Sequence, residues 1–211
     1  MSIFRQLTLI ALLFLPPATN PNAWSSPDEN EPGFVPLFNG KDLTGWEGDR
    51  TLWLVENGMI VGRSAGIKHN DFFNTTRTFG DFELRLSFHL VEGKGNSGIQ
   101  FRSKKIPGHV SGYQADIGEK YWGCLYDEAR RNKVLAQAPA ELDTVLKKEG
   151  WNDYVIRAQG DHIQLWVNGL RTVNYRETDP AIERDGIISL QLHSGGPLEV
   201  QFKNLRIKEL K

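Results

Sequence analysis

The sequence predicts an all-β protein, an antiparallel β-sandwich with one short helix. Short runs of alternating apolar and polar residues, glycine-rich turns between these runs, and little helical periodicity all favour this fold class. In such strands alternate side chains face the core, so two sheets can share one interior. We therefore expect residues 33–211 to form a single sandwich domain, which can bury about 70% of its unfolded surface without disulfides.

The amino terminus has the pattern of an export signal. Arg5 gives a positive start, Leu7 to Leu15 form an apolar run, and Pro16 ends it. The run is shorter than the roughly 20 residues that a membrane-spanning helix needs. We therefore expect a signal peptide over residues 1–23, no membrane insertion after its removal, and a periplasmic or extracellular protein.

Residues 24–32, directly after the expected signal peptide, are polar and contain proline, which predicts a flexible leader. The formal net charge is −1 and the charges are interspersed, which excludes a basic surface for nucleic acid. Cys124 is the only cysteine. It leaves no intrachain disulfide or cysteine zinc site, and we expect it to be a small buried apolar group.

The strands can be placed from their patterns. Residues 82–90, FELRLSFHL, alternate with the apolar side chains at even positions. Residues 162–177 predict two strands joined at Asn168 and Gly169, since both residues tolerate the positive φ of a tight hairpin. Further strands are expected over residues 186–196 and 198–210, and the short helix over residues 139–148, PAELDTVLKK.

A group of planar polar side chains marks the candidate site. Period-two alternation places Gln100 and Arg102 on one face of a strand, and Gln114 and Asp116 on one face of the next. Amides, a guanidinium and a carboxylate side by side offer several hydrogen bonds at once. This chemistry favours a surface that binds a polyhydroxylated ligand, a carbohydrate.

Six segments together resemble the family described as 3-keto-disaccharide hydrolases. In chain order they are LFNGKDLTGW at 37–46, FGDFELRLSF at 79–88, GNSGIQFRS at 95–103, GYQADIG at 112–118, GWNDYVIRAQGDHIQLWVNG at 150–169 and FKNLRIKEL at 202–210. The resemblance implies a concanavalin A-like jelly roll whose concave sheet holds carbohydrate. It also implies cleavage of a glycoside or disaccharide in which one sugar has been oxidised to a ketone at C3. Many members carry Glu then Gln where this chain has Gln114 and Asp116, so the acid has moved two residues along the same face.

A 3-keto-glycoside suggests an elimination mechanism. The ketone acidifies the hydrogen on C2, so a base can remove it, the C1 oxygen can leave, and water can add back. This route needs a base, a donor to the enolate oxygen and an acid for the leaving group. We expect Asp116 to be the base, Gln100 and Arg102 to stabilise the enolate, and His193 to protonate the leaving oxygen. Glu128 is a further catalytic candidate, because it could pair with Asp116 as the two carboxyl groups of ordinary glycosidases do.

The remaining candidates are residues that would bind the sugar. Beside Gln100 and Arg102, they are Gln114, Trp122, Tyr126, Arg130 and Gln191. A divalent ion could chelate the keto oxygen, but no metal motif appears and its ligands are not assigned. The histidines His69, His89, His109 and His162 show no partner spacing and are given no role.

The same sandwich could also serve as a lectin-like module that holds glycan without cleaving it, because the fold alone does not separate the two functions.

Overall fold

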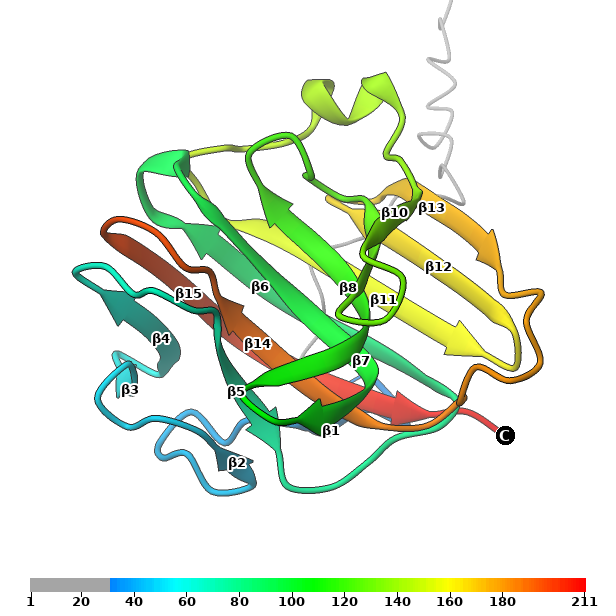
Figure 1. Cartoon of the computed structure of the whole chain (residues 1–211), viewed down its shortest axis with the longest axis horizontal. Helices are drawn as coiled ribbons and strands as arrows, with labels where there is room; N and C mark the ends of the chain where they lie inside the picture. The colour runs from blue at the N-terminus through cyan, green and yellow to red at the C-terminus, as the bar shows by residue number, and fades with distance from the viewer. Residues whose placement is uncertain (1–30) are drawn as a thin grey trace, which may run out of the picture.

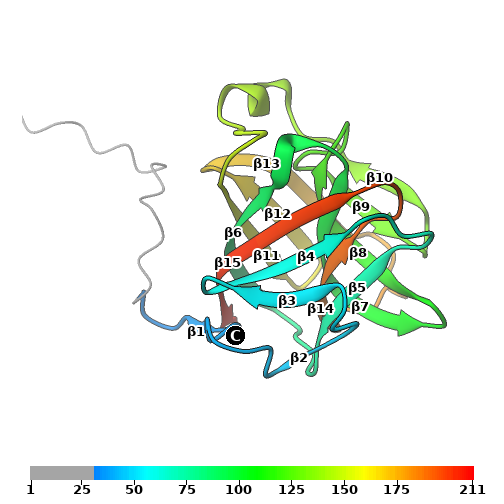
Figure 2. The same cartoon turned by 90° about the vertical axis from the view of Figure 1, so that its left-hand side faces the viewer.

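The computed structural model describes residues 31–211 and contains two antiparallel sheets packed face to face (Figure 2). The prediction of an antiparallel β-sandwich is therefore confirmed. The expected signal peptide and most of the expected leader lie outside the described residues. Within residues 31–211 no helix has the length and apolar character needed to cross a membrane.

One sheet has eight strands. In spatial order they are β13 (Leu170–Arg176), β12 (His162–Val167), β11 (Asn152–Gln159), β6 (Phe82–Leu90), β15 (Leu198–Glu209), β4 (Met59–Ser64) and β3 (Trp53–Glu56), with β1 (Val35–Pro36) also paired to β15. The predicted alternation holds in β6, where the even-numbered apolar residues are buried. The predicted hairpin between β12 and β13 is also present, with φ of 49° at Asn168 and 82° at Gly169.

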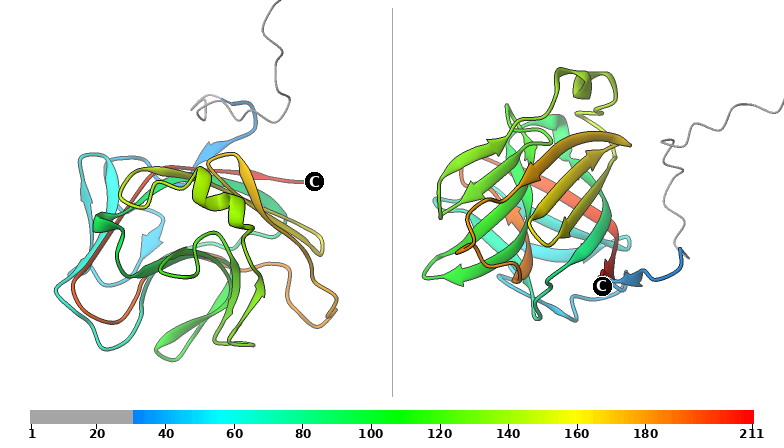
Figure 3. Two further views of the ribbon diagram at one scale, coloured as in Figure 1. Left: turned by 90° about the horizontal axis from the view of Figure 1, so that it is seen from above. Right: turned by 90° about the vertical axis from the view of Figure 1, so that its right-hand side faces the viewer.

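The other sheet has seven strands and carries the site. In spatial order they are β10 (Lys133–Ala136), β9 (Leu125–Glu128), β8 (His109–Gly118), β7 (Asn96–Ile106), β14 (Ile187–Leu192), β5 (Asp71–Thr75) and β2 (Trp46–Glu47). The two layers are seen from above in Figure 3. One side of this sheet, here called the inner face, packs Ile99, Phe101, Ala115 and Leu190 into the core. The opposite side is the outer face.

The expected helix over residues 139–148 is reduced to a 3₁₀ helix, Ala140–Thr144. Its N-cap is Pro139, which makes no side-chain capping bond, and Leu142 is its only buried residue. So short a segment with no cap and one anchor does not extend into a regular α-helix. A second 3₁₀ turn, Val91–Gly93, links β6 to β7.

A β-bulge interrupts the β7–β8 hairpin. The pairing register shifts between Phe101 and Lys104, and Arg102 lies at a φ of 47°. Two glycines make room for the bulge. A Cβ on Gly112 would lie 2.2 Å from Ser103 Oγ, and a Cβ on Gly186 would lie 2.5 Å from Ser103 N. Larger residues at either glycine would push the bulge out of place.

Beyond the bulge, the end of the hairpin bends toward β5 (Figure 1). Val110 is buried there in a small apolar cluster with Phe72 and Ile187. The His109 ring lies against Phe72, with 4.9 Å between ring centroids. Since Phe72 pairs with Gln191 while Phe73 enters the core, this cluster lies on the outer face. The hairpin tip thus covers part of the face that carries the site.

Candidate functional site

A polar cavity of about 190 Å³ opens on the outer face of the seven-stranded sheet. Its lining residues are Asn70, Asn96, Gln114, Asp116, Glu119, Tyr121, Tyr126, Glu128, Gln191 and His193. Strand register explains the convergence. Gln191, Gly98 and Asp116 form one row across β14, β7 and β8, and the neighbouring row includes Gln114 and Tyr126. Six residues predicted from the sequence therefore share one cavity: Gln114, Asp116, Tyr126, Glu128, Gln191 and His193.

Asp116 is the most buried carboxyl group of the cavity, at 3% exposure. Its Oδ1 accepts hydrogen bonds from Asn96 Nδ2 at 2.7 Å and from the Ile117 N–H at 3.1 Å. Its Oδ2 accepts one from Gln114 Nε2 at 3.0 Å. Burial raises the pKa of Asp116 to about 7, the hydrogen bonds from Asn96 and Gln114 oppose that rise, and the charge of Glu128 adds to it. Among residues 31–211 no cationic side chain forms an ion pair with this carboxyl group, which leaves the effect of burial on its pKa without a compensating positive charge.

Gln114 links the polar side chains of the cavity floor. Beside its bond to Asp116, its Nε2 lies 3.3 Å from Gln191 Oε1, and its Oε1 accepts a bond of 3.1 Å from Gln100 Nε2. Gly98 makes this arrangement possible, because a Cβ there would lie 2.6 Å from Gln114 Cγ and Cδ. Gln100 is fully buried beneath this network and does not line the cavity. The prediction that Gln100 contacts the substrate is therefore corrected.

Glu128 lies in the same cavity and contacts a histidine that the sequence did not single out. Its Oε1 is 3.3 Å from His109 Nε2. Burial raises the pKa of Glu128, while the charges of His109 and His193 oppose that rise. Glu128 is thus a second, partly buried carboxyl group in the cavity that contains Asp116, and it contacts the imidazole of His109.

His193 follows β14 and faces the cavity from the other side. Its Nδ1 lies 2.8 Å from the carbonyl oxygen of Ser194. In that contact Nδ1 donates its proton to the carbonyl oxygen. Nε2 is therefore the nitrogen that can exchange a proton with a ligand.

Two tyrosines add an aromatic wall. The rings of Tyr121 and Tyr126 meet edge to face, with centroids 6.1 Å apart. Tyr126 was expected to bind sugar, whereas Tyr121 was not identified because it lies in a loop.

Arg102 does not lie in the cavity. Its guanidinium donates to the carbonyl oxygens of Gly80 and Gly160, at 3.0 and 2.7 Å, and to Asp81 Oδ1 at 2.7 Å. The bulge at this residue is the physical reason, since it breaks the period-two alternation that placed Arg102 beside Gln100. Arg102 therefore links β7 to the segments around Gly80 and Gly160. The prediction that it contacts the substrate is wrong.

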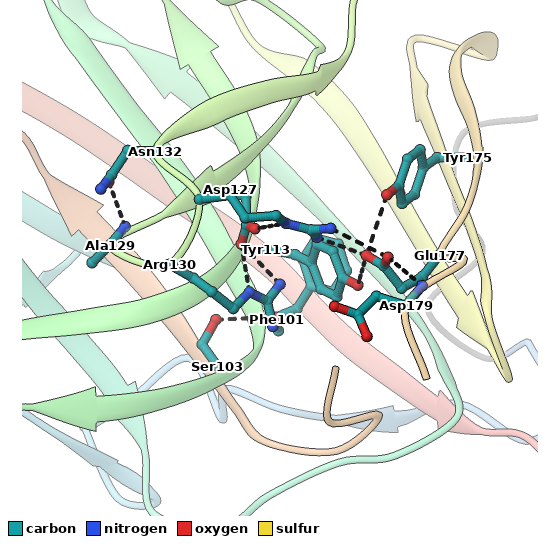
Figure 4. Close-up of polar contacts among 11 residues, drawn as sticks. Phe101, Ser103, Tyr113, Asp127, Ala129, Arg130, Asn132, Tyr175, Glu177 and Asp179 are labelled. Atoms are coloured by element: carbon teal, nitrogen blue, oxygen red, sulfur yellow. Dashed lines mark hydrogen bonds and ion pairs between the residues drawn. The ribbon is translucent and has the colours of Figure 1, made fainter. Parts of the chain in front are cut away.

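Trp122 and Arg130 also lie elsewhere. The indole of Trp122 is stacked on Phe88 at the edge of the core, with ring centroids 6.3 Å apart. Arg130 Nε donates to Asp127 Oδ1 at 2.9 Å, and its guanidinium lies 4.5 Å from the ring centre of Tyr113 (Figure 4). Leu125 and Asp127 point to the inner side of β9, and Arg130 follows Asp127 there. Both residues stabilise the fold and do not line the cavity.

The sequence analysis missed Asn70, Asn96, Glu119, Tyr121 and His109. Asn96 has the same parity as Gln100, so strand periodicity could have found it. The others lie in loops or beyond the bulge, where periodicity carries no signal. Among residues 31–211 no group of three or more His, Cys, Asp and Glu side chains is placed to hold a metal ion.

Three solved structures of similar fold are described as carbohydrate-related proteins. A candidate glycosyl hydrolase from Parabacteroides distasonis ATCC 8503 is 20% identical, with a TM-score of 0.66, covering 90% of this chain and 99% of its own. The carbohydrate-binding module CBM66 from Bacillus subtilis is 18% identical, with a TM-score of 0.63 and coverage of 79% and 97%. A Bacillus licheniformis β-glucanase is 11% identical, with a TM-score of 0.58 and coverage of 84% and 97%. These likenesses confirm the concanavalin A-like jelly roll.

The sequence itself gives a more specific result. A search of curated proteins found no match. Residues 33–208 match the family described as the 3-keto-alpha-glucoside-1,2-lyase-like domain, which confirms the family expected from the six segments. Family and fold together point to a carbohydrate-active, glycosidase-like protein. The chain belongs to the 3-keto-alpha-glucoside-1,2-lyase-like domain family.

Proposed function

We propose that the protein cleaves the glycosidic bond of 3-keto-glycosides, including disaccharides, by base-promoted elimination followed by hydration. One observation carries this proposal: Asp116, Glu128 and His193 line the same cavity, and burial raises the pKa of Asp116 to about 7. A general base works best when its pKa is close to the operating pH. The family description of a 1,2-lyase supports elimination across C1 and C2.

Asp116 is the proposed base for the C2 hydrogen. The bonds from Asn96, Gln114 and the Ile117 N–H hold both carboxylate oxygens in fixed directions. These donors are neutral, so they orient the carboxylate without the strong stabilisation that an arginine would give. Asp116 therefore keeps the basicity that removal of a carbon-bound proton requires.

The amides of Asn70 and Gln191 replace Arg102 as proposed donors to the enolate oxygen. Asn70 Oδ1 accepts the Ser194 N–H at 2.8 Å, so its NH₂ group is the end left to donate. Among the described residues Gln191 Nε2 is buried and has no hydrogen-bond partner. A buried N–H without an acceptor costs free energy, and a ligand oxygen in the cavity would supply that acceptor.

His193 is the proposed proton donor to the leaving oxygen. The C1–O bond breaks with its electron pair on oxygen, and that oxygen takes the proton from Nε2. Water then adds its hydroxyl group to C1, its other proton makes good the proton that His193 has lost, and Asp116 returns its proton to C2. The products are a 3-keto sugar and the released alcohol or second sugar.

One assay tests this proposal. The pure protein is incubated with a 3-keto-disaccharide and with its unoxidised parent, and released monosaccharide is measured. We expect release from the keto compound alone, because the parent lacks the acidified C2 hydrogen. Cleavage of both compounds, or of neither, would refute the elimination mechanism. The same assay after exhaustive chelation, with single ions added back, tests whether a divalent metal assists the keto oxygen.

The second candidate is a glycan-binding module, and the Tyr121–Tyr126 pair favours it. Aromatic rings commonly stack on the C–H faces of sugars, and these two form one wall of the cavity. Calorimetry with a panel of oligosaccharides separates the two functions. Tight binding of an unoxidised glycan without turnover of any 3-keto derivative would establish this candidate.

We also propose that the protein is exported, on the evidence of the amino-terminal pattern in residues 1–23. Mass determination of the protein recovered from its source cells tests this. A mature chain that lacks the first residues supports export, and an intact chain in the cytosol contradicts it.

A further inference from the structure

His109 contacts two oxygen atoms through its two ring nitrogens. Nδ1 lies 2.9 Å from the carbonyl oxygen of Val110, and Nε2 lies 3.3 Å from Glu128 Oε1. The carbonyl oxygen can only accept, so the proton of a neutral ring lies on Nδ1. An attractive contact at Nε2 then requires one more proton, on either the imidazole or the carboxyl group, so the geometry of the pair has a place for one proton.

The fold brings the side chains of His109 and Glu128 into contact. The bulge at Arg102 bends the hairpin so that its tip lies over the outer face, and His109 packs on Phe72 there. The His109 and Glu128 side chains retain 28% and 16% exposure, so the pair touches both solvent and cavity. Glu128 and His193 line the same cavity. The pair therefore lies between solvent and the cavity that holds the proposed acid.

We propose that the His109–Glu128 pair supplies the proton for the leaving-group step, with His109 as a positioning residue that acts through Glu128. This inference rests on the proposed function. After His193 Nε2 has protonated the leaving oxygen, Glu128 returns a proton to that nitrogen across the cavity that both residues line. During hydration, water adds hydroxide to C1 and gives its proton to Glu128, while Asp116 returns its proton to C2. Every proton is accounted for, and no further reactant is needed.

Two substrates that differ in their leaving group test the proposal. A sugar alcohol needs a proton to depart, whereas 4-nitrophenolate departs without one. For His109→Phe, which keeps a ring against Phe72, we expect cleavage of a 3-keto-disaccharide to fall about 10²-fold. Cleavage of 4-nitrophenyl 3-keto-glucoside should change little. Equal losses on both substrates would show a merely structural role, and no loss on either would also overturn the proposal. His109→Gln should behave as His109→Phe does.

The matched control is His162→Phe, since His162 lies on β12 in the other sheet and contacts Asn174. Both rates should stay at the wild-type level in this variant. A second readout does not depend on activity. In the free protein at pH 7, nitrogen-15 and carbon-13 spectra should show a proton on His109 Nε2 or on the Glu128 carboxyl group. A bare Nε2 beside an ionised carboxylate would refute the pair, whereas a protonated pair in a protein that cleaves neither substrate would refute only the proposed function.

Discussion

Asp116 and Glu177 are two carboxyl groups with opposite surroundings. Burial acts to raise the pKa of both. At Asp116 the side-chain partners are neutral amides and the pKa reaches about 7. At Glu177 the bonds from Arg131 and Tyr113 outweigh burial and hold the pKa at about 2. The comparison shows that the depth of burial and the charge of the hydrogen-bond donors together decide whether a carboxyl group keeps a raised or a lowered pKa.

The largest expected effect is on catalysis. Asp116→Asn removes the base but keeps a planar group of the same size, so we expect turnover of a 3-keto-disaccharide to fall at least about 10³-fold. Initial rates with folded protein, verified by circular dichroism, provide the measurement. Near-normal turnover would remove Asp116 from the mechanism.

The next effect is on stability and concerns the charged cluster of Figure 4. Asp127 has no exposed surface and accepts hydrogen bonds from Arg130 and Arg131. Asp127→Asn leaves Arg130 without its anion and Arg131 with Glu177 alone, so we expect the free energy of unfolding to fall by about 3 kcal/mol. Urea denaturation measures this. The rate per folded molecule should not change, and a loss of rate at full stability would contradict the structural role.

The two carboxyl groups should also respond oppositely to pH. Asp116 has a folded pKa of about 7, above its ordinary 3.8, so the stability it contributes is present below pH 3.8 and is lost as pH rises through 7. Glu177 has a lowered pKa, so its contribution is present above pH 4.5 and is lost as pH falls through about 2. Asp116→Asn should therefore stabilise the protein at pH 8, and Glu177→Gln should destabilise it there. Thermal unfolding at pH 4 and pH 8 gives the comparison; the same sign for both variants at pH 8 would refute it.

The smallest effect concerns the glycine beneath the cavity. Gly98→Ala places a methyl group against Gln114, which must move and give up its bond to Asp116. Because the atoms in contact belong to a flexible side chain, we expect the fold to persist and turnover to fall about tenfold. Gly80→Ala, where φ is not positive and a Cβ would meet no atom closer than 4.0 Å, is the control for glycine replacement as such. An unchanged rate in Gly98→Ala would show that Gln114 does not matter to Asp116.

The sequence predicted those parts of the site that strand periodicity governs. Gln114, Asp116 and Gln191 lie on regular strands at positions whose side chains point to the outer face, and the structure brings them together. Arg102 was misplaced because a bulge inserts an unpaired residue, and nothing in the local sequence marks that residue as the point of the shift. Asn70 and Tyr121 depend on how loops fold back over the sheet. His109 depends on the bend of a hairpin, which long-range packing on Phe72 sets.

The bent hairpin has a consequence for how such a site could change over time. It delivers His109 from a surface turn at Pro107 and Gly108, while Asp116 is anchored in the middle of the sheet. Lengthening or shortening that turn would move the imidazole at the start of β8 and leave the middle of that strand, which carries the Asp116 carboxylate, in place. Related chains could therefore adapt to aglycones of different acidity through one surface loop and leave the carbon-acid chemistry as it is.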